Sequence, residues 1–133
     1  MKIRWVGLVV VLLAVAGVLV VKQRTARPPQ APVASIGRPS VLLVADLREA
    51  DEAGDACAEI IRAVREAGKR GVPAQELMPN SNSDLIREHR VVTAPTVIVL
   101  GDDGRELVRF EGEGRDVLNA VNARLATLTT GTK

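Results

Sequence analysis

The sequence predicts a small α/β domain, spanning residues 40–128, whose strands and helices follow the order βαβαββα. Three observations lead to this prediction. They are a short apolar run at 41–44, a helical stripe of apolar residues that begins at Cys57, and a β-branched run at 96–100 followed by a second strand. The residues before this domain differ in character, because they form an apolar segment and a proline-rich linker.

The first strand and the first helix have clear patterns. Val41 to Val44 (VLLV) is a continuous apolar run, which is typical of a strand buried on both faces, as in a parallel sheet under helices. The acidic, aperiodic stretch from Asp46 to Asp55 predicts a loop. Asp55 is then a candidate N-cap, and Gly68 and Gly71 predict the end of the helix. The apolar face of this helix consists of Cys57, Ile60, Ile61 and Val64.

A weak strand and a short helix are predicted next. Val72 to Met78 has Pro73 near its start, which suits an edge strand because proline cannot donate a backbone hydrogen bond. Asn80 to Asp84 (NSNSD) supplies turn and cap residues for a short helix at 85–89.

The strongest strand signal lies in Val91, Val92 and then Thr96 to Leu100 (TVIVL), because this run is rich in β-branched residues. Asp102 to Gly104 predicts a turn, and Glu106 to Phe110 (ELVRF) alternates as a returning antiparallel strand. Residues 129–133 are expected to be a disordered tail. The closing helix has an apolar stripe of Val117, Val121, Leu125 and Leu128.

An apolar segment near the start predicts a membrane anchor. After a tail at 1–4, every residue from Trp5 to Val21 is apolar or glycine, and at about 1.5 Å per residue this run is just long enough to cross a bilayer core. Trp5 and flanking cations suit the two interfaces. A cleaved signal peptide is the alternative, because small residues follow at Ala31 to Ser35.

Residues 22–39 predict an extended tether, because they contain four prolines and no acidic residue. Cations nearly balance on the two sides of the apolar run, so the charge rule does not decide the orientation. A short tail before an apolar run is typical of an uncleaved export signal. We therefore expect a single-pass membrane protein whose domain is extracytoplasmic, in a periplasm or on an outer face.

Composition argues against several classes of partner. The formal charge is +2, yet all sixteen acidic residues lie at Asp46 or later, so the domain itself is acidic. With one Trp, one Phe and no Tyr it lacks stacking aromatics, and we expect no nucleic-acid binding. The single cysteine excludes an intramolecular disulfide and a cysteine-rich zinc site. The acidic stretches lack calcium-loop spacing, so we expect no metal and no cofactor.

The order of elements resembles the thioredoxin family. The resemblance covers about residues 41–128 and rests on the strand VLLV, the helix opening Gly54, Asp55, Ala56, Cys57 (GDAC), the segment Val91 to Thr96 (VVTAPT) and the hairpin TVIVLGDDGRELVRFEG. It implies a three-layer sandwich. It also implies a C-x-x-C motif at the helix opening after the central strand, and a cis proline, here Pro95, before the hairpin.

The motif is incomplete in this chain. Cys57 falls at the second, resolving position, whereas Gly54 occupies the first, attacking position. The tryptophan that commonly precedes the motif is missing, and the loop between strand and helix is longer than usual. Dithiol exchange needs one thiol to attack and a second to release the mixed disulfide. The resemblance therefore implies an active site without its attacking cysteine.

Cys57 has two interpretations. It is either a reactive monothiol that is oxidised, glutathionylated or bonded to a partner, or a small apolar residue that fills the core. Its apolar helix face favours the core. Asp51, Glu52 and Asp55 also crowd the helix start, where they oppose the positive helix end that would stabilise a thiolate.

A cis bond at Pro95 would leave the backbone of Ala94 free to pair with an extended peptide beside the start of the Cys57 helix. His89, at the end of a short polar helix, is expected to be solvated, because no catalytic or metal cluster can be assembled around it. The partner-binding residues that the resemblance implies are Gly54, Asp55, Ala56, Ala94, Pro95 and Thr96.

Two functions from different classes remain open at this point. The favoured one is a membrane-anchored, redox-degenerate module that binds a peptide or protein segment in a groove between the Cys57 helix and Ala94-Pro95. The alternative is a monothiol oxidoreductase that uses Cys57 with an external thiol as resolver. The enzyme needs Cys57 to be exposed among cations, so the surroundings of this thiol separate the two functions.

Overall fold

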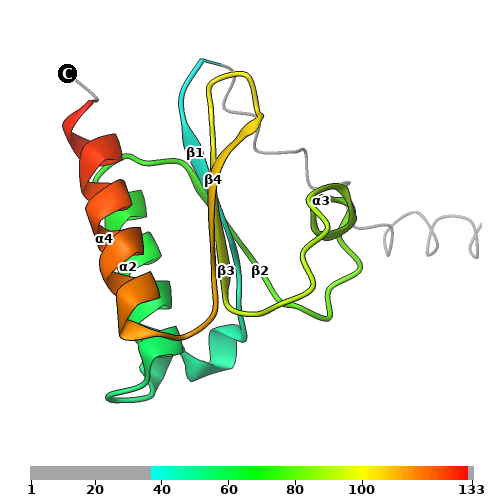
Figure 1. Cartoon of the computed structure of the whole chain (residues 1–133), viewed down its shortest axis with the longest axis vertical. Coiled ribbons are helices and arrows are strands. Elements are labelled where there is room, and N and C mark those ends of the chain that lie inside the picture. Colours follow the sequence, from blue (N-terminus) through cyan, green and yellow to red (C-terminus); the bar gives the residue numbers. More distant parts are fainter. Residues whose placement is uncertain (1–36, 132–133) are drawn as a thin grey trace, which may run out of the picture. The chain divides into compact units, whose positions relative to one another are not determined.

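The computed structural model describes residues 37–131, and the predicted order βαβαββα is confirmed within them (Figure 1). The strands are β1 (Ser40–Val44), β2 (Ala74–Leu77), β3 (Thr96–Leu100) and β4 (Glu106–Glu111). The helices are α2 (Ala56–Lys69), α3 (Asp84–Glu88) and α4 (Arg115–Thr130), and a 3-10 helix, η1 (Leu47–Asp51), precedes α2.

The predicted membrane anchor at 5–21 lies outside the described residues, as does the linker up to residue 36. Between residues 37 and 131, no helix combines the length and the apolar character that a membrane span requires.

The four strands form one sheet in the order β2-β1-β3-β4. β1 is parallel to β2 and antiparallel to β3, and β3 pairs with β4 as an antiparallel hairpin. Every residue of β1 is buried, as the continuous apolar run predicted, because this strand has a neighbour on each side and helices on both faces.

The sheet is the middle layer of three. Figure 1 shows α2 and α4 side by side on one face and α3 on the other. Side chains of β1 alternate accordingly: Val41 and Leu43 join the larger core under α2 and α4, and Leu42 and Val44 join a smaller core on the α3 side. Full burial of one aliphatic side chain contributes roughly 1.5–3 kcal/mol, so the larger core supplies most of the stabilisation.

The apolar stripe predicted for the first helix is confirmed, and so is its cap. Cys57, Ile60, Ile61 and Val64 are all buried. The Asp55 side chain accepts a hydrogen bond from the backbone N–H of Ala58 at 3.3 Å. The predicted end is confirmed as well, because α2 ends at Lys69, between Gly68 and Gly71, and the chain turns at Gly71, whose φ is +96°.

Other element boundaries also differ from the prediction. The stretch expected to be a loop contains η1, which begins where the Asp46 side chain accepts from the backbone N–H of Arg48 at 3.1 Å. The second strand is shorter than 72–78. Val92 is 91% exposed and lies outside β3, which starts only at Thr96. The last helix extends to Thr130 rather than ending near Leu128.

Candidate functional site

One end of the sheet brings together the residues that the sequence singled out. Val44, at the end of β1, pairs with Thr96, at the start of β3, and Thr96 also pairs with Glu111, at the end of β4. The chain leaves β1 at this end and reaches the start of α2 through η1. Cys57 is the second residue of α2, and Pro95 directly precedes β3. The fold therefore places both at the same end of the domain.

The segment before β3 has the backbone form that the resemblance implied. The Ala94–Pro95 peptide bond is cis. The Thr96 hydroxyl, which is fully buried, donates to the Thr93 carbonyl at 2.6 Å, and the Gly112 N–H donates to the Pro95 carbonyl at 2.9 Å. The first bond closes a turn within the segment, and the second ties Pro95 to the residue that follows β4.

Ala94 remains exposed beside this anchored proline. Within residues 37–131, neither its N–H nor its carbonyl has a backbone hydrogen-bond partner. Val92, two residues earlier, is the most exposed large hydrophobic residue of the described chain. Exposed, unpaired backbone next to an exposed apolar side chain is what strand-like peptide pairing requires.

Cys57 is buried, with only 2% of its surface exposed. It packs in the larger core with residues of the β1 strand and of α2. Burial raises the pKa of its thiol to about 12, and a hydrogen bond to the Glu49 side chain adds to that shift. Near neutral pH the group is therefore a protonated thiol, which is neither a nucleophile nor a good metal ligand.

The carboxylates near Cys57 are only partly those expected. The negative charges of Glu49, Asp55 and Glu113 further raise the pKa of Cys57. Asp55 was predicted, whereas Asp51 and Glu52, which were also predicted, are not among the causes of the shift. Glu49 belongs to the acidic stretch, and a sequence reading could have found it had η1 been recognised. Glu113 follows β4 and comes near Cys57 because β4 pairs with β3, and no local sequence pattern reveals this pairing.

Gly54, Asp55 and Ala56, the first three positions of the motif, each have a role in the backbone structure. Gly54 is exposed and has a φ of +81°, a left-handed conformation that other residues adopt only with strain. Asp55 is the helix cap and Ala56 is the first helical residue. A cysteine at position 54 would therefore have to bear an unfavourable backbone conformation.

Glu49, Asp55 and Cys57 are the one group within residues 37–131 whose side chains could offer three metal-ligand atoms, all within 4.8 Å of one another. Their proximity has another explanation, because the thiol and the Glu49 carboxylate share a hydrogen bond. A structural zinc site uses four ligands and deprotonated thiols, and this thiol has a strongly raised pKa. The residues present do not fit such a site.

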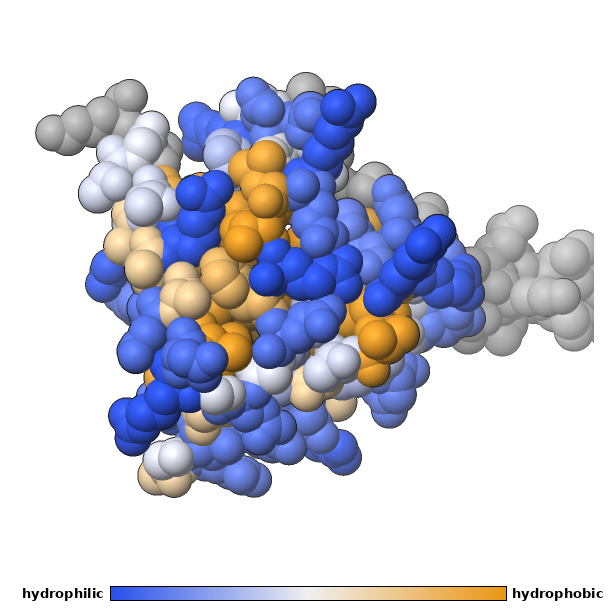
Figure 2. Space-filling view, in the orientation of Figure 1, coloured by the Kyte–Doolittle hydropathy of each residue, from blue (hydrophilic) through white to orange (hydrophobic). Residues whose placement is uncertain are grey.

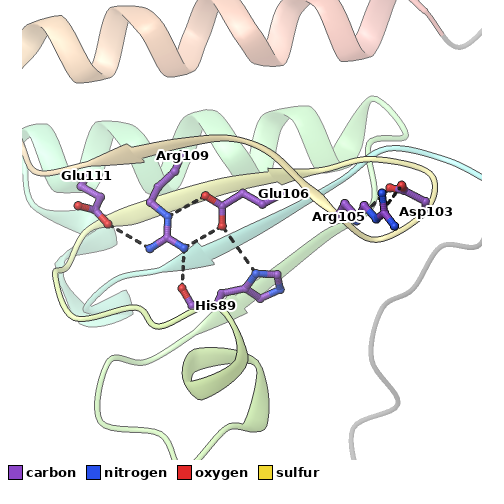
Figure 3. A network of polar contacts seen from close by, with 6 residues as sticks. All are labelled: His89, Asp103, Arg105, Glu106, Arg109 and Glu111. Atoms are coloured by element: carbon purple, nitrogen blue, oxygen red, sulfur yellow. Dashed lines mark hydrogen bonds and ion pairs between the residues drawn. The ribbon is translucent and has the colours of Figure 1, made fainter.

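His89 is not solvated as predicted, since only 12% of its side chain is exposed. Figure 3 shows the cause. Arg109 of β4 donates to the His89 carbonyl at 2.5 Å and forms a two-pronged ion pair with Glu106, whose carboxylate lies 3.8 Å from His89 Nδ1. Arg109 thereby ties the end of α3 to the sheet and lowers the pKa of Glu106. Cys57 is not part of this network.

Known structures resemble the domain in fold. Thioredoxin O2 from Arabidopsis thaliana in its oxidised state superposes with a TM-score of 0.52 at 16% identity, covering 72% of this chain and 83% of that one. Thioredoxin from Fasciola hepatica superposes with a TM-score of 0.48 at 23% identity, covering 66% of this chain and 81% of that one. An uncharacterized thioredoxin-like protein from Clostridium perfringens superposes with a TM-score of 0.48 at 18% identity, covering 78% of this chain and 90% of that one.

The likeness to thioredoxin O2 defines the fold of the domain. The domain has a thioredoxin-like fold, and its single cysteine stands in an incomplete C-x-x-C motif. Neither a protein-family model nor a curated protein sequence matches the chain.

Proposed function

We propose that this protein is a membrane-anchored thioredoxin-like module that binds an extended peptide or protein segment and does not catalyse dithiol exchange. The observation that carries this proposal is the state of Cys57. It is the sequence's one cysteine, it is buried, and its pKa is raised to about 12. A monothiol oxidoreductase would need an accessible thiolate, so these surroundings argue against the alternative.

The binding role is supported by the segment that precedes β3. Ala94 presents backbone groups without a backbone partner among the described residues, while the Thr96–Thr93 bond closes a turn around it and the Gly112–Pro95 bond ties the segment to the end of β4. A segment already fixed by hydrogen bonds can exchange main-chain hydrogen bonds with an extended peptide with little loss of its own conformational entropy. Gly54, Asp55 and Ala56 border the same end of the sheet and complete the proposed surface.

The membrane anchor is supported by the sequence alone. The apolar run at 5–21 and its flanking cations suit a single transmembrane helix, and residues 22–39 suit a tether. In this proposal the domain stands on the extracytoplasmic side, where a partner segment would be bound close to the membrane surface.

The binding role can be tested with a random twelve-residue peptide library selected on the full-length protein in neutral detergent micelles. Selected peptides should shift the amide resonances of Thr93 and Ala94. Replacing Ala94 with Trp should weaken the binding of these peptides more than about tenfold, because a loss of roughly 1.4 kcal/mol of binding free energy corresponds to that factor. Ala120→Trp, at an exposed alanine of α4, is the matched control and should have no effect.

The absence of redox turnover is tested in parallel. With dithiothreitol as reductant, the protein should not accelerate reduction of insulin disulfides, and Cys57→Ser should behave like the natural chain. Turnover that disappears in Cys57→Ser would support the monothiol oxidoreductase instead.

A further inference from the structure

The two faces of the sheet are covered to very different extents. On one face lie α2 and α4, whereas the other face carries α3, which has only five residues (Figure 1). Five helical residues extend about 7.5 Å, while the five residues of β1 extend about 16 Å. One short helix therefore cannot cover the whole of this face.

A cleft of about 200 Å³ lies where α3 ends. It is bounded by α3, by the start of β1 and by the turn between β3 and β4, and Ser40 and Leu100, which pair with each other, both line it. The Cys57 end of the sheet is marked by the Val44–Thr96 pair instead. The two pairs are four residue steps apart along β1, a distance of roughly 13 Å. The cleft is thus distinct from the site proposed above.

The floor of the cleft is aliphatic. Leu42 is 2% exposed at its base, and the partly buried Leu85 and Leu100 pack on the same small core from either side. Figure 2 shows that the surface seen in that view is mainly hydrophilic and that apolar patches interrupt it. An aliphatic floor favours an apolar occupant.

The rim of the cleft is acidic. Glu88 of α3 and Asp103 of the hairpin turn line it, and none of its lining residues, all within 37–131, is Lys or Arg. Glu88 is exposed and has no ion pair in this part of the chain. Asp103 pairs with Arg105 at 3.6 Å, but both side chains are more than half exposed, so that pair is weak. His89, the remaining titratable lining group, faces the Glu106 carboxylate (Figure 3).

The size of the cleft separates two kinds of occupant. Small-molecule sites usually enclose about 300–1,000 Å³, so this cleft is below that range and suits one or two side chains. Lysine matches both parts of the lining, because its methylene stem can lie on leucines while its ammonium group reaches a carboxylate at the rim.

We propose that the cleft between α3 and the β3–β4 turn is a second docking site, which binds a peptide segment carrying an aliphatic residue next to a lysine. The leucines of the floor take the aliphatic side chain and the lysine stem. Glu88 and Asp103 take the ammonium group. This site does not depend on Cys57 or on Ala94.

The test uses the full-length protein in neutral detergent micelles and the peptide acetyl-Gly-Ser-Leu-Lys-Leu-Ser-Gly-amide. A second peptide has glutamate in place of lysine. Amide resonances of Leu85 to His89 and of Leu100 to Gly104 should shift with the lysine peptide only. Glu88→Gln should weaken this binding by about two- to fivefold, as expected for one exposed charge pair, and high salt should remove the difference.

Glu113→Gln, at the Cys57 end, is the matched control and should leave the affinity unchanged. Equal affinity for both peptides, unchanged affinity in Glu88→Gln, or no binding at millimolar peptide would overturn the proposal. Shifts confined to Thr93 and Ala94 would also overturn it, while leaving the function proposed for that other end supported. Because Glu88 is exposed and unpaired among the described residues, its replacement should not affect folding.

Discussion

Cys57 is surrounded by carboxylates that come from three separate parts of the chain. Glu49 lies in η1, Asp55 caps α2, and Glu113 follows β4. Each negative charge disfavours the thiolate, and burial disfavours it more than any of them. At the scale of single residues, this end of the domain therefore keeps its thiol protonated.

The raised pKa of Cys57 predicts a specific pH dependence of stability. Above about 8.5 the thiol ionises in the unfolded chain, whereas in the folded protein it stays protonated up to about 12. The unfolded state then binds fewer protons, so the free energy of unfolding should fall by up to about 1.4 kcal/mol per pH unit across that window. Below about 8.5 this contribution is fully present.

Urea unfolding at a series of pH values, compared with Cys57→Ala, isolates this effect. The difference between the two proteins should shrink and then reverse as the pH rises. A difference that stays constant up to the highest pH would mean that the folded thiol ionises as readily as the unfolded one.

Removing the acceptor of the Cys57 hydrogen bond should make the thiol more acidic. In Glu49→Gln, both the negative charge and the charged hydrogen-bond acceptor are lost, so the pKa of Cys57 should fall and iodoacetamide should label it several-fold faster near pH 9. Glu52→Gln removes a charge from the same acidic stretch that is not among the causes of the shift. Similar acceleration in both variants would contradict the assignment.

The start of α2 shows what one cap contributes at the scale of an element. The Asp55 side chain accepts from the Ala58 N–H, whereas Ser83, at the corresponding position of α3, makes no such bond. The cap also determines where Cys57 lies, because it fixes the first turn of the helix that carries it. Loosening this turn should therefore affect stability and thiol exposure together.

Asp55→Ala should destabilise the protein by about 1 kcal/mol, within the range of roughly 0.5–2 kcal/mol for a lost N-cap. Urea unfolding measures this loss in the free energy of unfolding. Ser83→Ala is the matched control, and we expect it to change the free energy of unfolding by no more than a few tenths of a kcal/mol, since no side-chain bond is lost. Asp55→Asn should retain most of the stability because it keeps an acceptor oxygen. Equal losses in Asp55→Ala and Ser83→Ala would show that the cap contributes nothing.

Element positions were predictable where one local period dominates. The spacing of Cys57, Ile60, Ile61 and Val64 revealed the buried face of α2, and the run 41–44 revealed a strand buried on both faces. The surroundings of His89 were not predictable in this way. They depend on Arg109, twenty residues later, whose partner Glu106 lies on the same strand. Contacts that only the sheet register creates have no local signal.

At the scale of the whole molecule, the sequence indicated the order of the elements and the thioredoxin-like fold. It did not indicate that β1 has one parallel and one antiparallel neighbour, because strand order is set by how the α2 and α3 connections pack on the two faces of the sheet. The candidate site was located through the resemblance, since Pro95 and Cys57 are far apart in sequence and share no local pattern.

The anchor prediction concerns the complete chain. The full-length protein should remain with membranes during alkaline extraction, because an apolar segment of this length stays in the bilayer after peripheral contacts are lost. A shortened chain that begins at Arg38 should be found in the soluble fraction. Recovery of the natural protein in that fraction, with a shortened N-terminus, would indicate a cleaved signal peptide.

The most direct test of the whole account is the pH profile of iodoacetamide labelling at Cys57 in the folded, full-length protein. We expect slow labelling at neutral pH and a rate that rises about tenfold per pH unit without levelling off below about pH 11, because the thiolate fraction grows in that proportion below the pKa. The same chain in denaturant should react quickly and level off above about pH 8.5. Rapid labelling of the folded protein with a plateau at or below neutral pH would reveal an exposed, acidic thiol and would contradict the redox-inactive role.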